Sequence, residues 1–245
     1  MFTGIIKEVG KLNKIIRINT GLEIEVSSSL LTKDMKPGDS IAVNGCCLTV
    51  KDFQAGNSFK ADISFATLKA TTFGLLRAGS YLNLEDAVKL SDKLGGHIVS
   101  GHIDNTGMIT KISKKGDFHK IDIRIPKNIL PFTAPKGSIS VDGVSLTIAD
   151  CVNEIMEFAI ILFTFENTNF KYKKTGEKVN IEVDLMARYI LNMAKYSNPI
   201  SGSTAADPSY FLNISKMWGV ADEIKNKNDK NFDLEEKLKK YGFKK

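Results

Sequence analysis

Two side chains capable of nucleophilic or acid–base chemistry occupy matched places in two similar stretches of the sequence. Cys47 lies in the stretch Asn44–Thr49, and Ser145 lies in the stretch Asp142–Thr147, 98 residues further along the chain. A thiol or a hydroxyl at such a place can assist addition to an electron-poor carbon or hold a water molecule there. The matched pair predicts two related sites that carry different reactive groups.

The two stretches also predict which side chains face a ligand. Side chains on a β-strand alternate between its two faces. Cys47 therefore shares a face with Thr49, and Ser145 shares the equivalent face with Thr147, whereas Cys46 points into a core as a small hydrophobe. Small polar side chains on the non-core face favour a concave surface that holds a ligand. The alternative is a strand face that is only solvated.

Histidine supplies the second kind of chemistry. His102 stands where the first half has Ile5, and the glycine-rich run Gly95–His102 lets the backbone approach a flat ligand closely. An imidazole titrates near neutral pH and can move protons, so His102 either contacts a ligand or is structural. His97 fits a structural residue better than a ligand contact. His119 lies among lysine and aspartate residues and is expected to be solvated.

These differences between the halves lead to a functional hypothesis. We expect one half to combine Cys47 with Ile5 and the other to combine Ser145 with His102. Two related pockets with different polar groups suit two similar ligands that are handled differently. A reaction between two copies of one molecule has that requirement.

The elements that must position these residues belong to a duplicated chain. Ser40–Thr49 returns as Ser138–Thr147, and Gly79–Glu85 returns as Gly176–Glu182, always at an offset of 97 or 98 residues. A repeat of this length is a whole domain rather than a solenoid unit. We expect a first domain over residues 1–90, a second over 97–184, a helix over 185–198 and a basic tail over 199–245.

Hydrophobic patterning makes both halves β-rich. Short apolar or alternating runs separated by Gly, Asn, Pro and Lys are typical of small antiparallel barrels or sandwiches, with about six strands each. After Asp184 the apolar residues recur at helical spacing, which predicts a helix over about 185–196. The runs read as strands are Ile15–Ile18, Leu22–Val26, Ser40–Val50, Ile121–Ile125, Ser138–Ile148, Met156–Thr164 and Lys178–Val183.

Composition excludes several classes of protein. Of the net charge of +6, Lys225–Lys245 carries +4 (eight lysines against four acids), so the repeats are nearly neutral and nucleic-acid binding is not favoured. Three cysteines make no disulfide framework and fit a reducing cytoplasm. We expect no signal peptide, membrane span or metal site.

At these residues the chain resembles the riboflavin synthase family, which is built from two lumazine-binding repeats. Met1–Ile5, Asn44–Thr49, Gly95–Ile103 and Asp142–Thr147 match in order and spacing. The resemblance implies an all-β fold of two tandem six-stranded antiparallel Greek-key barrels with a C-terminal helix that assembles a homotrimer. It also implies a cytoplasmic transferase that needs no cofactor, and possible association with lumazine synthase.

The implied reaction is a dismutation, in which two molecules of 6,7-dimethyl-8-ribityllumazine exchange a four-carbon unit. Its products are riboflavin and 5-amino-6-(ribitylamino)uracil. The resemblance assigns Cys47, His102 and Ser145 to catalysis. It assigns substrate binding to Gly4, Ile5, Ile6, Leu48, Thr49, Asp62, Ser64, Ala66, Thr67, Gly101, Ile103, Lys136, Leu146, Thr147, Leu162 and Thr164.

The sequence departs from the family at two places. A glutamate usual before Thr67 is replaced by Ala66, and the residue before Thr164 is Phe163 where a glutamate is common. The main alternative is a lumazine- or flavin-binding protein of the same fold without catalysis. A flavin reductase barrel is not supported, because no nicotinamide-binding glycine motif follows a strand and opens a helix.

Overall fold

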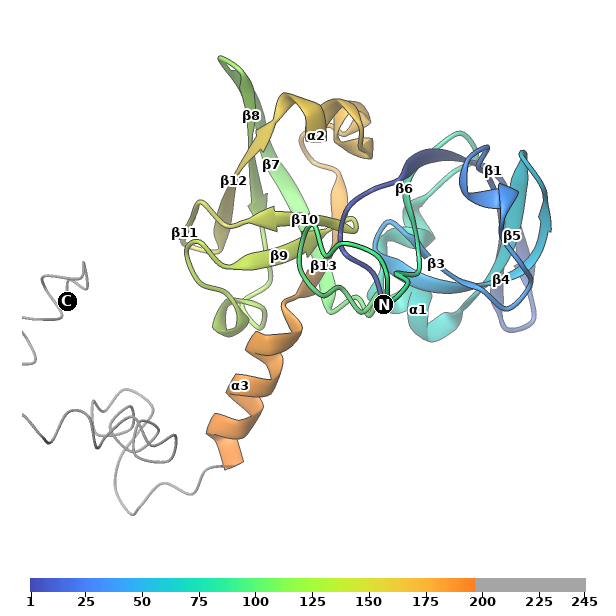
Figure 1. Cartoon of the computed structure of the whole chain (residues 1–245). Helices are drawn as coiled ribbons and strands as arrows, with labels where there is room; N and C mark the ends of the chain where they lie inside the picture. The colour runs from blue at the N-terminus through green and yellow to red at the C-terminus, as the bar shows by residue number, and fades with distance from the viewer. Residues whose placement is uncertain (197–245) are drawn as a thin grey trace, which may run out of the picture. The chain divides into compact units, whose positions relative to one another are not determined.

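The computed structural model describes residues 1–196, and the side chains up to residue 193. The expected tail over 199–245, and the last two residues of the helix expected over 185–198, lie outside the described residues. Figure 1 shows two β-rich bodies along the chain, followed by one helix. None of the helices in this part of the chain is long and apolar enough to cross a bilayer.

The first half is a closed antiparallel barrel with the strand order β1-β2-β5-β4-β3-β6. This order, in which β3 and β4 lie between β5 and β6, is a Greek-key arrangement. Short helical turns over Leu31–Lys33, Phe65–Ala70 (α1) and Thr72–Leu75 connect the strands. The strands are β1 (Glu8–Ile18), β2 (Gly21–Ser27), β3 (Ser40–Val43), β4 (Cys46–Gln54), β5 (Ser58–Ser64) and β6 (Tyr81–Asp86).

The second half repeats this plan with one difference. Its sheet has the order β10-β9-β13-β7-β8-β12-β11, and its first and last strands are two pieces of the strand equivalent to β4, with Ile148 and Ala149 between them. The duplicated barrel fold predicted from the sequence is confirmed. The strands are β7 (Asn105–Lys115), β8 (Phe118–Arg124), β9 (Ser138–Val141), β10 (Val144–Thr147), β11 (Asp150–Val152), β12 (Ile155–Ile161) and β13 (Lys178–Val183).

Three of the predicted strand runs contain a turn or a strand end. Ser40–Val50 and Ser138–Ile148 are each a hairpin rather than a single strand, because Asn44-Gly45 and Asp142-Gly143 adopt positive φ (46° and 78°, 46° and 82°). An Asn-Gly or Asp-Gly pair of this kind forms the two-residue turn that suits the strand twist. Met156–Thr164 was also too long, since β12 ends at Ile161 and α2 (Leu162–Glu166) begins.

Each half encloses its own apolar core. The predicted alternation holds in both hairpins, with Cys46 and Leu48 buried in the first core and Val144 and Leu146 buried in the second. Cys46 thus fills a core position, and burial raises the pKa of its thiol to about 12. The opposite faces of β4 and β10 are left free to carry polar side chains.

Buried amides join the two barrels. Asn83 Nδ2 donates to the carbonyl oxygen of Asp142 at 2.9 Å, and Asn180 Nδ2 donates to that of Asn44 at 2.9 Å. Within the second half, Lys173 forms an ion pair with the buried Asp142 at 2.9 Å. Each barrel therefore satisfies the hairpin turn of the other, which holds the hairpins β3–β4 and β9–β10 against each other.

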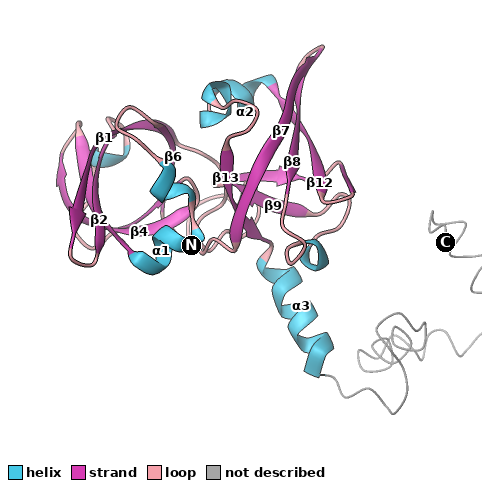
Figure 2. Ribbon diagram, turned by 180° about the vertical axis from the view of Figure 1, so that it is seen from behind, coloured by secondary structure: helices cyan, strands magenta, loops and turns pink. Residues whose placement is uncertain are grey.

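The helix predicted over about 185–196 is present as α3 (Leu185–Tyr196). Arg188 anchors its first turns by donating to both oxygens of Asp104 at 2.8 and 2.9 Å. Apolar side chains remain exposed on this helix, among them Met186, Tyr189 and Ile190. Figure 2 shows α3 running away from the second barrel.

Candidate active site

Two short segments, residues 1–6 and 98–103, lead into the first strand of each half and run antiparallel. Phe2 N donates to Val99 O at 2.8 Å, and Val99 N donates to Phe2 O at 3.0 Å. Both side chains are buried in a small cluster of their own. The two leading segments are thus held together where the barrels meet.

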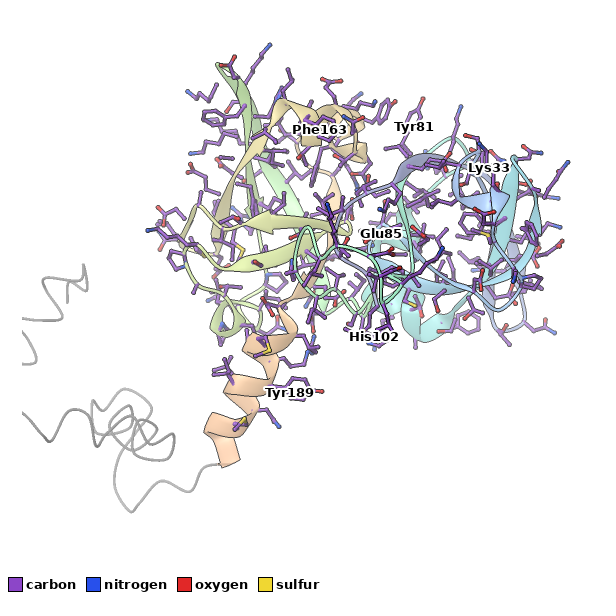
Figure 3. The ribbon with its side chains drawn as sticks, in the orientation of Figure 1. Lys33, Tyr81, Glu85, His102, Phe163 and Tyr189 are labelled. Atoms are coloured by element: carbon purple, nitrogen blue, oxygen red, sulfur yellow. The ribbon has the colours of Figure 1, made fainter. Side chains whose placement is uncertain are left out.

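A buried glutamate fixes each leading segment to its own half. Glu85 of β6 accepts from Thr3 N and Thr3 Oγ1 at 2.7 Å each, and from Gly4 N at 3.0 Å. Glu182 of β13 accepts in the same way from Ser100 and Gly101, at 2.6 to 3.0 Å. Burial raises the pKa of both carboxyl groups, while these hydrogen bonds oppose the shift. Figure 3 shows Glu85 and His102 close to the junction of the barrels.

Each leading segment also lies against the hairpin of the other half. Ser145 N donates to Gly4 O at 2.8 Å, and Cys47 N donates to Gly101 O at 2.9 Å. Ile6 correspondingly packs against the second core, and Ile103 packs against the first. The halves therefore exchange their leading segments, and each candidate pocket is built from both.

The exchange requires glycine at both contact points. A Cβ on Gly4 would lie 2.6 Å from Ser145 Cβ, and one on Gly101 would lie 2.5 Å from Cys47 Cβ. The φ angles, +76° and +84°, are also ones that other residues rarely adopt. The absence of a side chain lets the backbone of each leading segment reach the reactive residue of the other half.

The expected pairing of reactive groups is therefore wrong. Gly101 and His102 accompany Cys47, while Gly4 and Ile5 accompany Ser145. The sequence comparison assigned each leading segment to its own half, because repeats align along the chain and carry no information on exchange. The leading segments that carry His102 and Ile5 therefore meet the reactive residues in the opposite combination.

His97 lies at the second candidate pocket, although its sequence context favours a structural role. Its Nδ1 lies 2.7 Å from Ser145 Oγ, the ring is only 8% exposed, and the buried Nε2 finds no partner among the described residues. Burial lowers the pKa of His97, although the nearby Asp184 charge opposes the shift, so the ring is neutral at pH 7. A neutral imidazole bonded to a hydroxyl can accept its proton.

The sequence does not reveal the contact between His97 and Ser145, because this contact depends on the exchange of leading segments. Gly96 precedes it, and a Cβ there would lie 2.2 Å from Thr3 O and 2.8 Å from Ser145 Cβ. The usable signal was this glycine, which marks a close backbone approach just before the histidine. His119 was also misplaced: it lies on β8, half-buried and stacked on Phe165 with ring centroids 3.7 Å apart, instead of being solvated in a loop.

The other residues expected in the first pocket lie around the outer face of β4. Thr49, Asp62 and Ser64 are exposed on β4 and β5, and Ser64 Oγ lies 3.0 Å from Thr67 Oγ1 at the start of α1. Ser64 caps α1 by accepting from Thr67 N at 3.2 Å. Ala66 is exposed on the same helix. The Leu48 side chain points into the core, so this residue offers the pocket only its backbone.

The second pocket follows the same plan with different side chains. Thr147 is exposed on β10, Leu162 and Thr164 lie on α2, and the Leu146 side chain is buried in the core. Lys136 is exposed at a turn with φ of +67°, held by its N–H donating to Ile148 O at 2.8 Å. Phe163, at a place where a carboxylate was expected, is 74% exposed.

Comparison with known proteins detects both halves of the duplicated chain. The sequence model of the lumazine binding domain matches twice, over residues 3–87 and 100–184. The riboflavin synthase of Actinobacillus pleuropneumoniae is 42% identical over 190 residues, covering 78% of this chain and 88% of that protein. The riboflavin synthase of Bacillus subtilis is 39% identical over 198 residues, covering 81% and 92%.

Solved structures of lumazine- and riboflavin-bound LumP have a similar fold. The crystal structure of LumP complexed with riboflavin aligns with a TM-score of 0.70 at 26% identity, covering 75% of this chain and 99% of that one. The structure of LumP complexed with 6,7-dimethyl-8-(1'-D-ribityl) lumazine aligns with a TM-score of 0.68, also at 26% identity and with the same coverage.

Proposed function

The chain belongs to the riboflavin synthase family, and from this premise we propose that it is a riboflavin synthase, a transferase. Two molecules of 6,7-dimethyl-8-ribityllumazine would exchange a four-carbon unit, giving riboflavin and 5-amino-6-(ribitylamino)uracil. Relatives named riboflavin synthase at 39 to 42% identity over most of the chain support this activity.

The observation that carries the proposal is a pair of pockets on one plan with different reactive groups. The first presents the Cys47 thiol beside the leading segment that carries His102, and the second presents the Ser145 hydroxyl bonded to His97. A dismutation needs two copies of one molecule held in related sites but treated differently. Duplication followed by divergence, as at Cys47 and Ser145, would give such an arrangement.

The protein's own part in the reaction is orientation and proton movement. The substrate already carries an electron-poor ring and an acidic methyl group at C7, so holding two rings in one geometry supplies much of the acceleration. In the second pocket, neutral His97 can accept the proton of Ser145, or of a water molecule held there, as that oxygen adds to the lumazine ring. In the first pocket, His102 is exposed next to the Cys47 strand and can exchange protons with the ligand.

We also propose a homotrimer in which the first pocket of one subunit faces the second pocket of its neighbour. The exposed Met186, Tyr189 and Ile190 on α3 supply an apolar surface for assembly. Each pocket described above is an open strand face, and apposition of two would exclude water from the stacked rings. From the family we further propose a cytoplasmic location and association with lumazine synthase.

The test is incubation with the lumazine alone. We expect riboflavin and the ribitylaminouracil to appear in equal amounts without any added cofactor or metal. The competing function is ligand binding without turnover, which the likeness to LumP with bound ligands favours. Stoichiometric binding of the lumazine with no riboflavin after prolonged incubation would refute the synthase and support the binding protein.

A further inference from the structure

A row of three charged side chains crosses the outer face of the first barrel. Lys51 Nζ lies 2.5 Å from Glu23 Oε2 and 3.1 Å from Asp62 Oδ1. The three residues lie on the adjacent strands β4, β2 and β5, with Asp62 on the middle strand. Lys51 therefore bridges two carboxylates on the sheet surface that also carries the first pocket.

A bulge in β4 places Lys51 in this row. The register between β4 and β5 shifts between Val50 and Asp52, which leaves Lys51 as the extra residue. Such a bulge re-aims a side chain relative to its neighbours. Asp62 stands opposite Glu23 in the ladder between β2 and β5, so Lys51 meets both carboxylates at once. The pKa of Lys51 is raised by its hydrogen bond to Glu23, which keeps the ammonium group charged.

The row adjoins the polar residues of the first pocket. Lys51 follows exposed Thr49 by two residues on β4, and Asp62 precedes exposed Ser64 by two residues on β5. Alternate residues of a strand lie on one face. Asp62 accepts Lys51 through Oδ1, while Oδ2 has no partner among the described residues and remains able to accept from a ligand.

The second half has no counterpart of this row. The positions equivalent to Lys51 and Asp62 are Ala149 and Ala159, and the position equivalent to Ser64 is Ile161. Opposite Ala159 stands Lys120, which is already engaged by Glu157 and Asp122. The positions equivalent to Lys51, Asp62 and Ser64 therefore carry apolar side chains in the second half, and no carboxylate stands at the position of Asp62.

We propose that Lys51 is a specificity-determining positioning residue, which holds Asp62 so that its free oxygen accepts hydrogen bonds from the hydroxyl groups of the ligand's ribityl chain. The first pocket then depends more strongly on a polyhydroxylated side chain than the second pocket, which has no carboxylate at the position of Asp62. This inference rests on the proposed function, because it takes the ligand to be a ribityl-substituted ring.

Riboflavin and lumiflavin test the inference, because lumiflavin has a methyl group in place of the ribityl chain. Binding of each is measured by equilibrium dialysis on the full chain, and the preference is the ratio of the two dissociation constants. In Lys51→Met we expect the preference for riboflavin over lumiflavin to fall about tenfold at one of the two classes of binding sites, as for a lost charge-assisted hydrogen bond. Lumiflavin binding should be unchanged. Lys51→Arg should retain most of the preference.

Lys60→Met is the matched control, because Lys60 makes a comparable exposed ion pair with Asp52 (3.4 Å) and does not contact Asp62. It should leave both dissociation constants at wild-type values. Ala159→Asp introduces a carboxylate at the equivalent position of the second half. We expect it to raise the preference for riboflavin over lumiflavin at the other class of binding sites. Thermal unfolding of each variant confirms that folding is intact.

The outcomes separate this inference from the proposed function. A wild type that makes riboflavin, together with a Lys51→Met variant of unchanged preference, would overturn the role of Lys51 alone. An equal loss for both flavins would also overturn it, since the effect would then concern the ring or the fold. A wild type that neither binds riboflavin nor makes it would refute the proposed function itself.

Discussion

At the scale of single residues, the contact between Ser145 and His97 distinguishes the second pocket. The half-buried Ser145 hydroxyl lies 2.7 Å from an imidazole whose pKa is lowered by burial, and such a pair marks a candidate functional site. The equivalent thiol, Cys47, has no such partner among the described residues, and its neighbouring histidine, His102, is exposed. The two candidate pockets thus differ both in the thiol or hydroxyl that they present and in the histidine beside it.

We predict that Ser145→Ala and His97→Asn each lower kcat about ten- to a hundredfold while the fold is retained. The reason is loss of a positioned proton carrier, which is worth about 1 to 3 kcal/mol of transition-state stabilisation. Steady-state kinetics and thermal unfolding measure the two effects. Cys46→Val is the control, because the second half already has Val144 there, and it should be nearly silent. Wild-type rates in both variants would remove the pair from the mechanism.

The second prediction concerns pH. Because burial lowers the pKa of His97 from its ordinary value of 6.5, the folded state binds this proton less readily than the unfolded chain. The resulting stability is fully present above pH 6.5 and is lost as pH falls through the lowered pKa. Denaturant unfolding from pH 7.5 to 4.5 should show this loss in the wild type and a smaller one in His97→Asn. Equal slopes in both proteins would contradict the assignment.

The sequence predicted some, but not all, of the residues of the candidate site. Cys47 and Ser145 followed from strand periodicity and the repeat, because a face with alternating small polar residues is visible in one dimension. His97 did not, since its partner lies 48 residues away through an exchange that repeat alignment cannot detect. The roles of the remaining pocket residues, such as Lys136 and Thr164, stay predictions.

At the scale of elements, two hairpins and two leading segments build both pockets. The hairpin turns rest on each other, since a Cβ on Gly45 would lie 2.6 Å from Gly143 N. Each leading segment is held on one side by a glutamate and on the other by a hairpin strand. The sequence predicted the strands, but it read each hairpin as one strand, because the Asn-Gly and Asp-Gly turns interrupt the alternation only briefly.

We predict that Gly101→Ala damages the first pocket more than it damages the barrel. The added methyl group would meet Cys47 Cβ at 2.5 Å, in addition to the strain of a φ of +84°. Gly38→Ala is the matched control, because Gly38 has a similar φ of +92° with nothing within 4 Å. The control should lose about 1 to 2 kcal/mol of unfolding free energy with normal turnover, whereas Gly101→Ala should lose more stability and most of its activity. Similar behaviour of the two variants would show that the contact is unimportant.

At the scale of the whole molecule, the two pockets of one chain open on separate barrels. The proposed trimer would bring the pocket of one subunit against that of its neighbour, so that two ligands can stack. The sequence predicted the duplicated barrels and the helix, because both follow from periodicity and internal repetition. Assembly could not be predicted from periodicity or repetition, because these patterns contain no information on contacts between subunits. The exposed apolar residues on α3 are the feature of this helix that points to such contacts.

The fourth prediction is complementation between inactive chains. One chain carries Cys47→Ala and Thr49→Val, and the other carries His97→Asn and Ser145→Ala, so that each variant loses one pocket as the structure defines it. After the two are mixed, unfolded and reassembled, activity should reappear, because some shared sites contain two intact pockets. Reassembled wild type sets the maximum. A mixture as inactive as its components would place the site within one chain.

The fifth prediction concerns the C-terminal region. Residues 1–194 form one compact unit, and both pockets lie within it. A chain that ends at Asn198 should therefore fold and turn over substrate at wild-type rates. Size-exclusion chromatography and steady-state kinetics of this truncation measure the outcome. Aggregation or loss of turnover would assign the remaining residues a structural role.

The exchange of leading segments also bears on how the chain arose. A single ancestral half could not have completed its own pocket, because the segment before its first strand lies against the hairpin of another half. It would have functioned as a pair of identical chains, with two identical pockets. Fusion of two such copies would keep that pairing within one polypeptide and release the copies from identity. A mutation in one hairpin would then change one pocket only, so that cysteine and serine could become fixed at equivalent positions.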